Sequence, residues 1–169
     1  GVFAGSTFCA AIQNNDMVAA YANDNWSEPN LQPARKDITL PLEDVSVTTF
    51  VKNLQTNVTT DTLDFDIQVL NGDSSQLGKK DFKEDVNIIF YDGDNAEHKM
   101  IEFFNNMLGF TENVFTLVVD DANVEQNVAI TKGWVEKQKL NILYERELIN
   151  DQEDDKMWWN GLYVLVLAK

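Results

Sequence analysis

The chain has 169 residues, of which 44% are hydrophobic and 11% aromatic, enough to bury the core of one domain without disulfides or a structural metal. Its 28 acidic and 13 basic side chains give a net charge of -15, so the average surface repels polyanions and anionic membranes. The single Cys9 excludes an intramolecular disulfide. Because no apolar stretch reaches about 18 residues and no charged start precedes an apolar run, we expect neither a transmembrane helix nor a retained signal peptide.

The first 41 residues predict an N-terminal arm. Apolar side chains in residues 6–21 recur at the spacing of an amphipathic helix, or of two short helical turns. Residues 23–41 hold all three prolines and no sustained periodicity, which indicates an extended lead-in. We therefore expect an arm at 1–41 and a single β-rich domain at 42–169.

Three strands are predicted in the next part of the chain. Valine and threonine alternate with other residues in 45–51, and apolar and acidic side chains alternate in 63–69. Residues 86–90 continue this apolar pattern after a polar loop that begins at Asn71. Strict alternation is typical of strands that bury one face, so these segments predict half-buried strands.

One helix is strongly indicated, at about residues 95–108. Asp94 or Asn95 supplies its N-cap, Gly109 follows its last turn, and the apolar side chains between them form one stripe. We expect this stripe to pack against one end of a sheet.

The remaining chain predicts more strand than helix. A short strand is expected at 115–119, a brief helix at 121–128 and a long strand at 132–146. Residues 162–168 are apolar on both faces, which is typical of a central strand. Together the elements predict a mainly β (α+β) fold, either an OB-like barrel or a β-sandwich, with one principal packed helix and an extended N-terminal arm.

The inventory of catalytic groups is sparse, so we predict that the protein is not an enzyme and uses no cofactor or metal. Cys9 and His98 could form a nucleophile and base, but a buried thiol and a solvated imidazole are the commoner arrangement. The run Asp92 to Asn95 has oxygen ligands without the spacing of a calcium loop, and a turn with a helix cap explains it better. The acidic residues 153–155 are interpreted as a solvated loop.

Basic and aromatic side chains form the one group of residues whose chemistry suggests a specific function. A groove for single-stranded nucleic acid needs cations along the phosphates and flat side chains on which bases stack. Tryptophans pack in the cores of β-domains more often than they stack on bases, and acidic residues interrupt each lysine cluster, so a purely structural role is the alternative. The candidate nucleic-acid-binding residues are Lys79, Lys80, Lys83, Lys132, Trp134, Lys137, Lys139, Tyr144, Arg146 and Trp158.

The order of these elements resembles that of small phage single-stranded-DNA-binding proteins with an OB-fold. The resemblance rests on the lead-in ending at Pro41, the strand ending in Val69-Leu70-Asn71-Gly72, the step Gly78-Lys79-Lys80-Asp81-Phe82, and the helix with its Gly109. It implies sequence-tolerant binding of single-stranded DNA through an open barrel face. It also implies a cytoplasmic location in an infected host cell and a homo-oligomer, without membrane contact.

The alternative function is a self-assembling structural subunit of a virion, fibre or surface layer. A β-sandwich whose 1–41 arm exchanges with a neighbouring copy explains the acidity and the absence of catalytic groups. This alternative places the protein in a virion or an extracellular assembly. An enzyme ranks last among the three classes.

Overall fold

The computed structural model describes residues 5–13, 15, 17–26, 47–58, 65–149 and 160–169. The chain divides into two compact units, which comprise residues 1–76 and 77–169. The boundary predicted after residue 41 lies outside the described residues, so the division into an arm and one domain stays a prediction.

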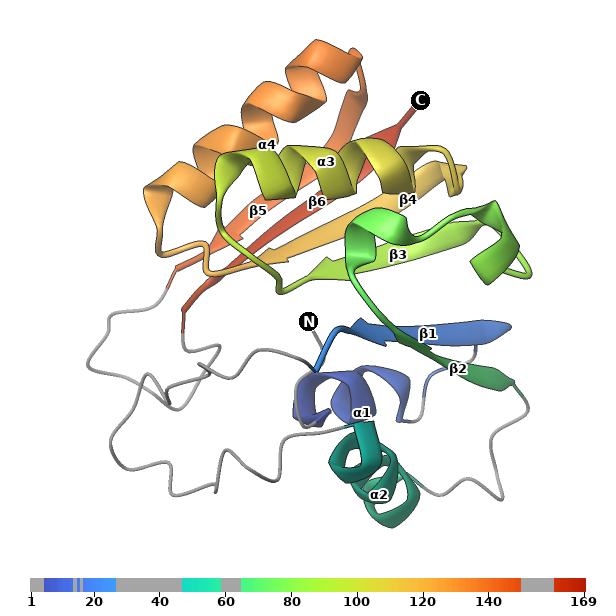
Figure 1. The fold of residues 1–169 in the computed structure, drawn as a ribbon. Coiled ribbons are helices and arrows are strands. Elements are labelled where there is room, and N and C mark those ends of the chain that lie inside the picture. Colours follow the sequence, from blue (N-terminus) through green and yellow to red (C-terminus); the bar gives the residue numbers. More distant parts are fainter. Residues whose placement is uncertain (1–4, 14, 16, 27–46, 59–64, 150–159) are drawn as a thin grey trace. The chain divides into compact units, whose positions relative to one another are not determined.

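The first unit contains two helices and a two-stranded parallel sheet. Residue partners run from Ala19 opposite Asp66 to Asp24 opposite Asn71, so both strands end at the same edge of the sheet (Figure 1). Its elements are α1 (Ser6–Ile12), β1 (Ala19–Asp24), α2 (Val47–Asn57) and β2 (Asp66–Asn71), with a 3-10 turn, η3 (Ser74–Gln76), after them.

The core of the first unit is built from both helices and from β1. Phe50 is fully buried, and the rings of Phe8 and Trp26 lie 5.6 and 5.8 Å from its ring. Apolar side chains from β2 pack partly buried against this core. The buried members of the cluster are Cys9, Ile12, Ala20, Ala22, Phe50, Leu54 and Val58.

Two predictions in the first unit are wrong. Residues 47–51 of the strand expected at 45–51 form the start of α2, whose buried Phe50 and Leu54 are four residues apart. A helical stripe and a strand look alike over so short a stretch, and helix packing outweighs the strand propensity of valine and threonine. The helix expected at 6–21 ends at Ile12, and the chain continues into β1.

The second unit contains a four-stranded mixed sheet in the order β3-β4-β6-β5. β3 and β4 are parallel, and β6 runs antiparallel to both of its neighbours. The elements are a 3-10 turn, η4 (Lys79–Asp81), β3 (Val86–Tyr91), α3 (Glu97–Leu108), β4 (Thr111–Asp120), α4 (Glu125–Gln138), β5 (Asn141–Leu148) and β6 (Leu162–Ala168).

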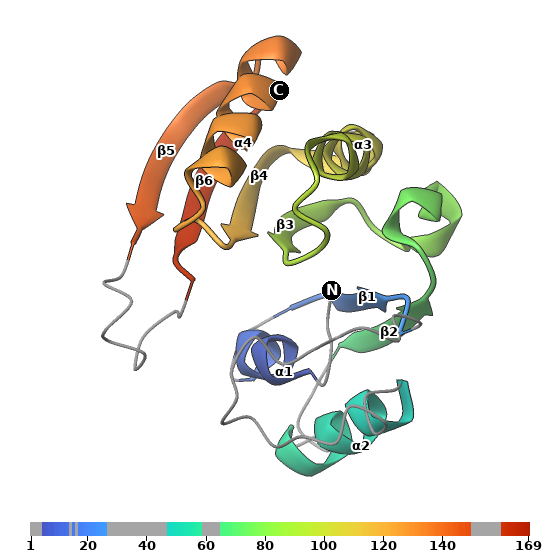
Figure 2. The ribbon, with the colours of Figure 1, turned by 60° about the vertical axis from the view of Figure 1, so that its left-hand side comes forward.

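Helices α3 and α4 lie together over one face of this sheet (Figure 2). The ring of Phe104 on α3 lies 5.1 Å from that of Trp134 on α4 and 5.3 Å from that of Tyr91 on β3. Every second side chain of the central strands is buried, which is the pattern of strands with one face against a helical layer. These buried side chains are Phe115, Leu117, Val119, Tyr163, Leu165 and Leu167.

The helix predicted at about 95–108 is confirmed as α3, and the predicted central strand at 162–168 is confirmed as β6 between β4 and β5. The long strand predicted at 132–146 is wrong, because α4 continues to Gln138 and β5 begins only at Asn141. Val128, Thr131 and Val135 of α4 are buried at spacings of three and four residues, which is a helical stripe.

The predicted fold class is also wrong. Within the described residues the four-stranded sheet is open, since its outer strands β3 and β5 each pair with one neighbour, so it closes no barrel. Helices and strands alternate along the chain, and α1 and β1 precede residue 25. The protein is therefore an α/β structure rather than an OB barrel or a β-sandwich. No helix in the described ranges is both long and apolar enough to cross a bilayer.

Gly5 is the glycine whose replacement tests the packing of the first unit. Its φ of 91° is unfavourable for other residues, and an added Cβ would lie 2.5 Å from the buried ring of Phe50. We expect Gly5→Ala to destabilise the protein by about 2–4 kcal/mol in chemical denaturation.

The matched control is Gly133→Ala within α4. A Cβ there meets no atom within 4 Å, so the change should stabilise the helix by about 0.5–1 kcal/mol. Equal effects of the two substitutions would contradict the packing described for Phe50.

Candidate functional site

Ligands of open α/β sheets bind outside the carboxyl ends of parallel strands, so these edges are where a site is expected. In the first unit this edge holds Asp24 and Asn71. The backbone N–H of Gly72 donates to the carbonyl of Asp24 at 2.9 Å, which extends the pairing one residue beyond the strands. The side-chain amide of Asn23 donates to the carbonyls of Leu70 and Gly72 at 2.8 and 3.1 Å. These bonds fix the ends of both strands.

Acidic side chains flank the same edge. The Asp24 carboxylate accepts a hydrogen bond from the backbone N–H of Trp26 at 2.9 Å, and Asp73 accepts one from the N–H of Ser75 at 2.9 Å. Among the described residues, apart from its chain neighbours, no atom lies within 4 Å of the position that a Cβ would take on Gly72. The edge therefore presents two oriented carboxylates.

In the second unit, three segments meet at the carboxyl edge of β3 and β4. Asn95 follows β3, Asp121 follows β4, and Asn160 precedes β6. The side-chain amides of Asn95 and Asn160 donate to the two carboxylate oxygens of Asp121, at 2.7 and 2.5 Å. The Asp121 side chain thus joins three loops at the end of the sheet.

The backbone around Asp121 is tightly constrained. Asp121 has a φ of 58° and Gly161 a φ of 77°, both in the left-handed region. A Cβ on Gly161 would lie 2.4 Å from the side-chain oxygen of Asn123 and 3.0 Å from the carbonyl of Leu148. Glycine is required at position 161, because any other side chain would separate β6 from the loop after β4.

Asp120, the last residue of β4, is the carboxyl group with the most perturbed acidity at this edge. Burial, with the nearby carboxylates of Asp92 and Asp121, raises its pKa to about 6, although the backbone N–H of Asp121 donates to it at 2.8 Å. Burial, with the charges of Asp94 and Asp92, also raises the pKa of Tyr91 to about 12. Asp120 is therefore the described carboxyl group best suited to exchange a proton near neutral pH.

The carboxylates do not form a metal site in the part of the chain that the structure describes, since no three His, Cys, Asp or Glu side chains there are placed to hold an ion. The run Asp92 to Asn95 is a turn that leads into α3, as its sequence predicts. The Asp94 carboxylate accepts from the backbone N–H of Ala96 at 2.9 Å, and the Tyr91 hydroxyl donates to the Asp94 carbonyl at 2.7 Å.

The predicted nucleic-acid-binding residues do not line one groove. Lys79, Lys80 and Lys83 precede β3, whereas Tyr144 and Arg146 lie on β5 at the other end of the strand order. Three strand spacings separate β3 from β5, about 14 Å. The other predicted residues are Lys132, Trp134 and Lys137 on α4, Lys139 at its C-cap, and Trp158, which lies outside the described residues.

Two of these residues, Trp134 and Lys132, have structural roles in the second unit. Trp134 is 2% exposed, and its indole N–H donates to the side-chain oxygen of Asn105 at 3.0 Å, so its ring belongs to the core. The Lys132 ammonium group lies 3.1 Å from Glu145 and 2.8 Å from Glu147. Neither arrangement offers a stacking platform or a phosphate contact.

The pair of Cys9 and His98 does not form a catalytic dyad. Cys9 is buried in the core of the first unit, and burial raises the pKa of its thiol. His98 is an exposed residue of α3 in the second unit. The expected buried thiol and solvated imidazole are confirmed.

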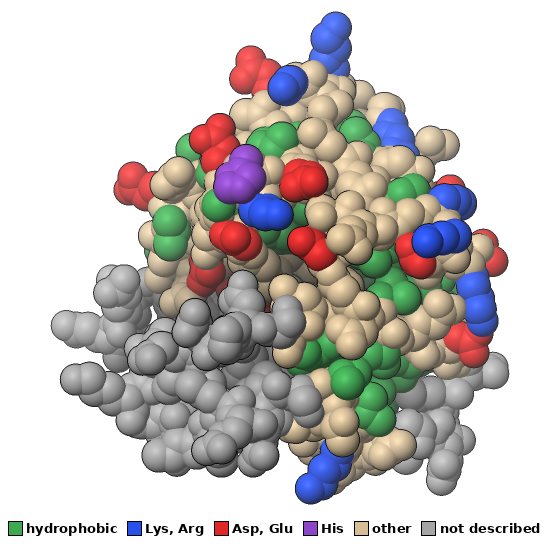
Figure 3. Space-filling view, viewed as in Figure 1, with side chains coloured by type: hydrophobic (Ala, Val, Ile, Leu, Met, Phe, Trp, Pro, Cys, Tyr) green, Lys and Arg blue, Asp and Glu red, His purple; other side chains and the backbone are tan. Residues whose placement is uncertain are grey.

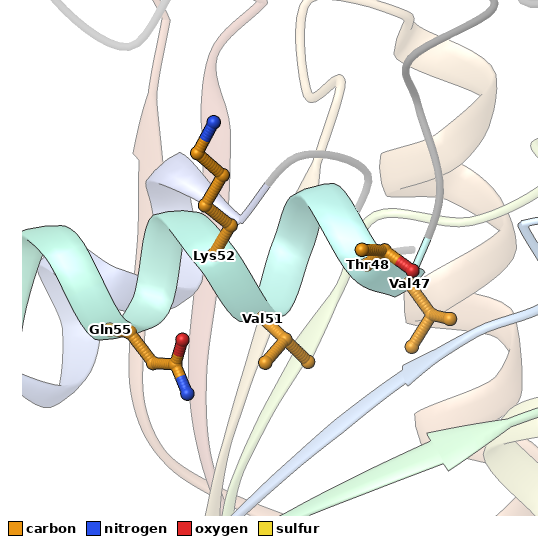
Figure 4. A pocket seen from close by; sticks show the side chains of 5 residues that line it. All are labelled: Val47, Thr48, Val51, Lys52 and Gln55. Atoms are coloured by element: carbon orange, nitrogen blue, oxygen red, sulfur yellow. The ribbon is translucent and has the colours of Figure 1, made fainter.

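A shallow pocket on α2 carries no catalytic group. Val47, Val51 and Gln55 point to one side of this helix and Lys52 to the other (Figure 4). All of the lining side chains come from one helix, so no side chain of a second element contributes to this pocket.

The sequence matches no protein family profile and no curated protein. Comparison with solved structures finds an rRNA methylase from Streptococcus thermophilus, with a TM-score of 0.54 and 12% identity, covering 100% of this chain and 82% of that one. It also finds the O-methyltransferase NovP, with a TM-score of 0.58 and 10% identity, covering 98% of this chain. The chain spans 65% of the length of NovP.

The likeness to these two structures shows that the protein has a Rossmann-like α/β fold. This finding overturns the resemblance to phage single-stranded-DNA-binding proteins, because the chain has the fold of methyltransferases and not an OB barrel. The predictions of non-catalytic nucleic-acid binding, of a structural subunit and of a protein that is not an enzyme are wrong on the same evidence. Homo-oligomer formation and the cellular location stay predictions.

Sequence reasoning missed Asp24, Asp120 and Asp121 as candidate site residues. A signal for Asp24 was present, because an acidic residue that ends a strand about 20 residues after a glycine turn is typical of nucleotide-binding α/β proteins. The prediction of one helix over residues 6–21 concealed β1 and therefore this spacing.

The ionisation of Asp120 should make the stability of the folded protein depend on pH. Its pKa of about 6 exceeds the unfolded value, so the ionised group costs stability, and this cost develops between about pH 4 and 6 and is complete above it. We expect Asp120→Asn to stabilise the protein at pH 7.5 by roughly 1–2 kcal/mol, after allowance for solvent screening.

The measurement is the difference in unfolding free energy between variant and wild type at pH 7.5 and at pH 4.5. This difference should shrink towards zero at the lower pH. A constant difference, or one that grows on acidification, would show that the ionisation of Asp120 does not destabilise the folded protein.

Proposed function

We propose that the protein transfers a methyl group from S-adenosylmethionine to a nucleophilic atom of an acceptor. The support is the fold, which it shares with an rRNA methylase and an O-methyltransferase over nearly the whole chain. A shared fold hosts many functions, so the proposal depends on what the residues at the strand ends can bind. It replaces the expectation that the protein uses no cofactor.

The observation that carries the proposal is the position of Asp24. It ends β1, follows the Gly5 turn and α1, and lies at the carboxyl edge of a parallel strand pair. In Rossmann-like folds an acidic residue at this place, about 20 residues after the glycine turn, accepts hydrogen bonds from ribose hydroxyls. An adenosyl group contains such a ribose, so the residues present fit this donor.

The geometry at Asp24 favours this role. The N–H of Trp26 holds one carboxylate oxygen, and the bond from Gly72 to the Asp24 carbonyl fixes the backbone beneath it. A carboxylate that is fixed before binding loses little freedom when two hydroxyl groups donate to it. We therefore assign Asp24 to binding and orienting the donor.

When bound, S-adenosylmethionine supplies a methyl group on a positively charged sulfur. The acceptor's lone pair forms the new bond to the methyl carbon, the carbon–sulfur bond breaks with its electron pair going to sulfur, and a hydroxyl acceptor must then release a proton. Within the second unit, Asp120 is the described carboxyl group with a pKa near neutrality, at about 6.

The test is calorimetric titration of the protein with S-adenosylhomocysteine, the demethylated form of the donor. Hydrogen bonds to a charged group contribute about 1.5–3 kcal/mol, so Asp24→Asn should weaken binding about tenfold to 150-fold.

Asp66→Asn is the matched control, because Asp66 begins β2 at the opposite edge of the same sheet. It should change the affinity by less than about twofold, as expected for a surface carboxylate away from the ligand. Undetectable binding to the wild type, or equal losses in both variants, would refute the proposed function.

A further inference from the structure

We infer that two copies of the protein associate through the outer side of β5, so that their four-stranded sheets join into one continuous sheet. This side of residues 141–148, which faces away from β6, is called the β5 edge below. Every residue on which the association depends belongs to the second unit, and the association is a property separate from methyl transfer.

The backbone of β5 is available on one side. β5 is the outermost strand of its sheet (Figure 2). Within the described residues it pairs with β6 alone, so the backbone N–H and C=O groups on its other side have no strand to bond there. A row of such groups is bound most completely by another extended strand, which adds to the sheet. The β5 edge therefore suits a strand as its partner.

The side chains at this edge are more apolar than those of an outer strand that avoids pairing. Ile142, Leu143 and Tyr144 are consecutive, and they are 46%, 59% and 47% exposed. Outer strands that avoid pairing are short, or carry proline, lysine or other charged residues. β5 spans eight residues without proline or lysine, and its first four residues carry no charge. The first half of β5 thus lacks these protections.

The charges at the β5 edge are balanced, although the whole chain carries a net charge of -15. Lys132 of α4 lies 3.1 Å from Glu145 and 2.8 Å from Glu147. The Tyr163 hydroxyl also donates to Glu145, at 2.7 Å. Together with Arg146 these side chains make two acidic and two basic groups, so a second copy meets no net charge at this edge.

The helical side of the second unit is less suited to self-association. Figure 3 shows that the side covered by α3 and α4 carries acidic and basic side chains, with hydrophobic ones scattered among them. Scattered apolar side chains are normal on a protein surface, whereas contiguous ones mark interaction sites. The exposed apolar run of β5 is therefore the stronger indication of a binding surface.

A second copy is the partner that matches the shape of this edge. The pairing of β5 with β6 shifts its register between Ile142 and Tyr144, and an irregularity of this kind bends and twists a strand locally. A twofold axis at Tyr144 brings the same bend of the second copy to the same place. An isologous contact of this kind closes as a dimer and leaves no further β5 edge open.

The charges also select the position of the twofold axis. Tyr144 and Glu145 lie at the middle of β5, and Arg146 follows them. In an antiparallel pair related by a twofold axis, the residue on the axis lies opposite its own copy. Two glutamates or two arginines in that position repel each other, whereas two tyrosine rings attract. The axis therefore lies at Tyr144.

Cysteine crosslinking tests this arrangement on the full chain. Directly opposed Cα atoms of an antiparallel pair lie about 4.5–5.5 Å apart, and a disulfide needs about 4.4–6.8 Å. Tyr144→Cys therefore brings two sulfur atoms into range across the axis. Mild oxidation should convert most of this variant to a covalent dimer, which a non-reducing gel detects.

Arg146→Cys is the matched control for crosslinking. With the axis at Tyr144, the two copies of residue 146 lie about 13 Å apart, so this variant should crosslink at least about tenfold more slowly. Wild-type protein, whose one cysteine is the buried Cys9, measures the background. Equal rates in the two variants, or faster crosslinking of Arg146→Cys, would overturn the pairing.

Sedimentation equilibrium measures the association without a crosslink. One added strand pair buries less than about 1,200 Å², so we expect a weak dimer with a Kd of roughly 10–100 µM. Tyr144→Lys places two like charges opposite each other and should weaken this dimer at least about tenfold.

Val114→Lys is the control for sedimentation, because Val114 is 50% exposed on β4, a strand that does not border the β5 edge. It should change the Kd by less than about twofold. A wild type that stays monomeric at every concentration would overturn the inference. So would a larger loss in Val114→Lys than in Tyr144→Lys, since it would show that the copies pack through the face of the sheet.

Discussion

Parallel pairing of neighbouring strands is the constraint on which the rest of the structure depends. A parallel pair needs a crossover of a dozen or more residues, so helices separate the strands of both pairs, β1 with β2 and β3 with β4. It also brings the carboxyl ends of each pair to one edge. Asp24 and Asn71 thereby become neighbours in the first unit, and Asp120 comes to end the strand beside β3 in the second. The candidate sites at the two edges each follow from topology more than from any local motif.

Much of the second unit could be predicted from the sequence. The apolar stripe and Gly109 mark α3, although its N-cap is Ala96 and not Asp94 or Asn95 as predicted, and the two-sided apolar run at 162–168 marks a strand buried within the sheet. The brief helix predicted at 121–128 covers only the start of α4, and the rest of α4 was missed because Thr131, Trp134 and Val135 also suit a strand and Gly133 disfavours a helix interior. What decided its structure was a buried stripe that packs on α3, which is a tertiary effect.

The site was harder to predict than the fold, because its residues are separated in the sequence and unremarkable one by one. Asp121 gains its role from amide groups of Asn95 and Asn160, 26 and 39 residues away. The lysines and tryptophans drew attention because their residue types suit nucleic acids, yet Trp134 fills the core and the lysines lie mainly at the edge away from the strand ends. Residue type predicted a function that their positions do not support.

The central claim is that the carboxyl edge of β1 and β2 binds an adenosyl ligand. The most direct measurement is an amide chemical-shift titration of the whole chain with S-adenosylhomocysteine. Saturable shifts that include Asp24, Asn71 and Gly72, and leave Ala19 and Asp66 at the other end of the same strands little changed, are the predicted result. Saturable shifts centred on Ala19 and Asp66, or no saturable shifts at all, would contradict it.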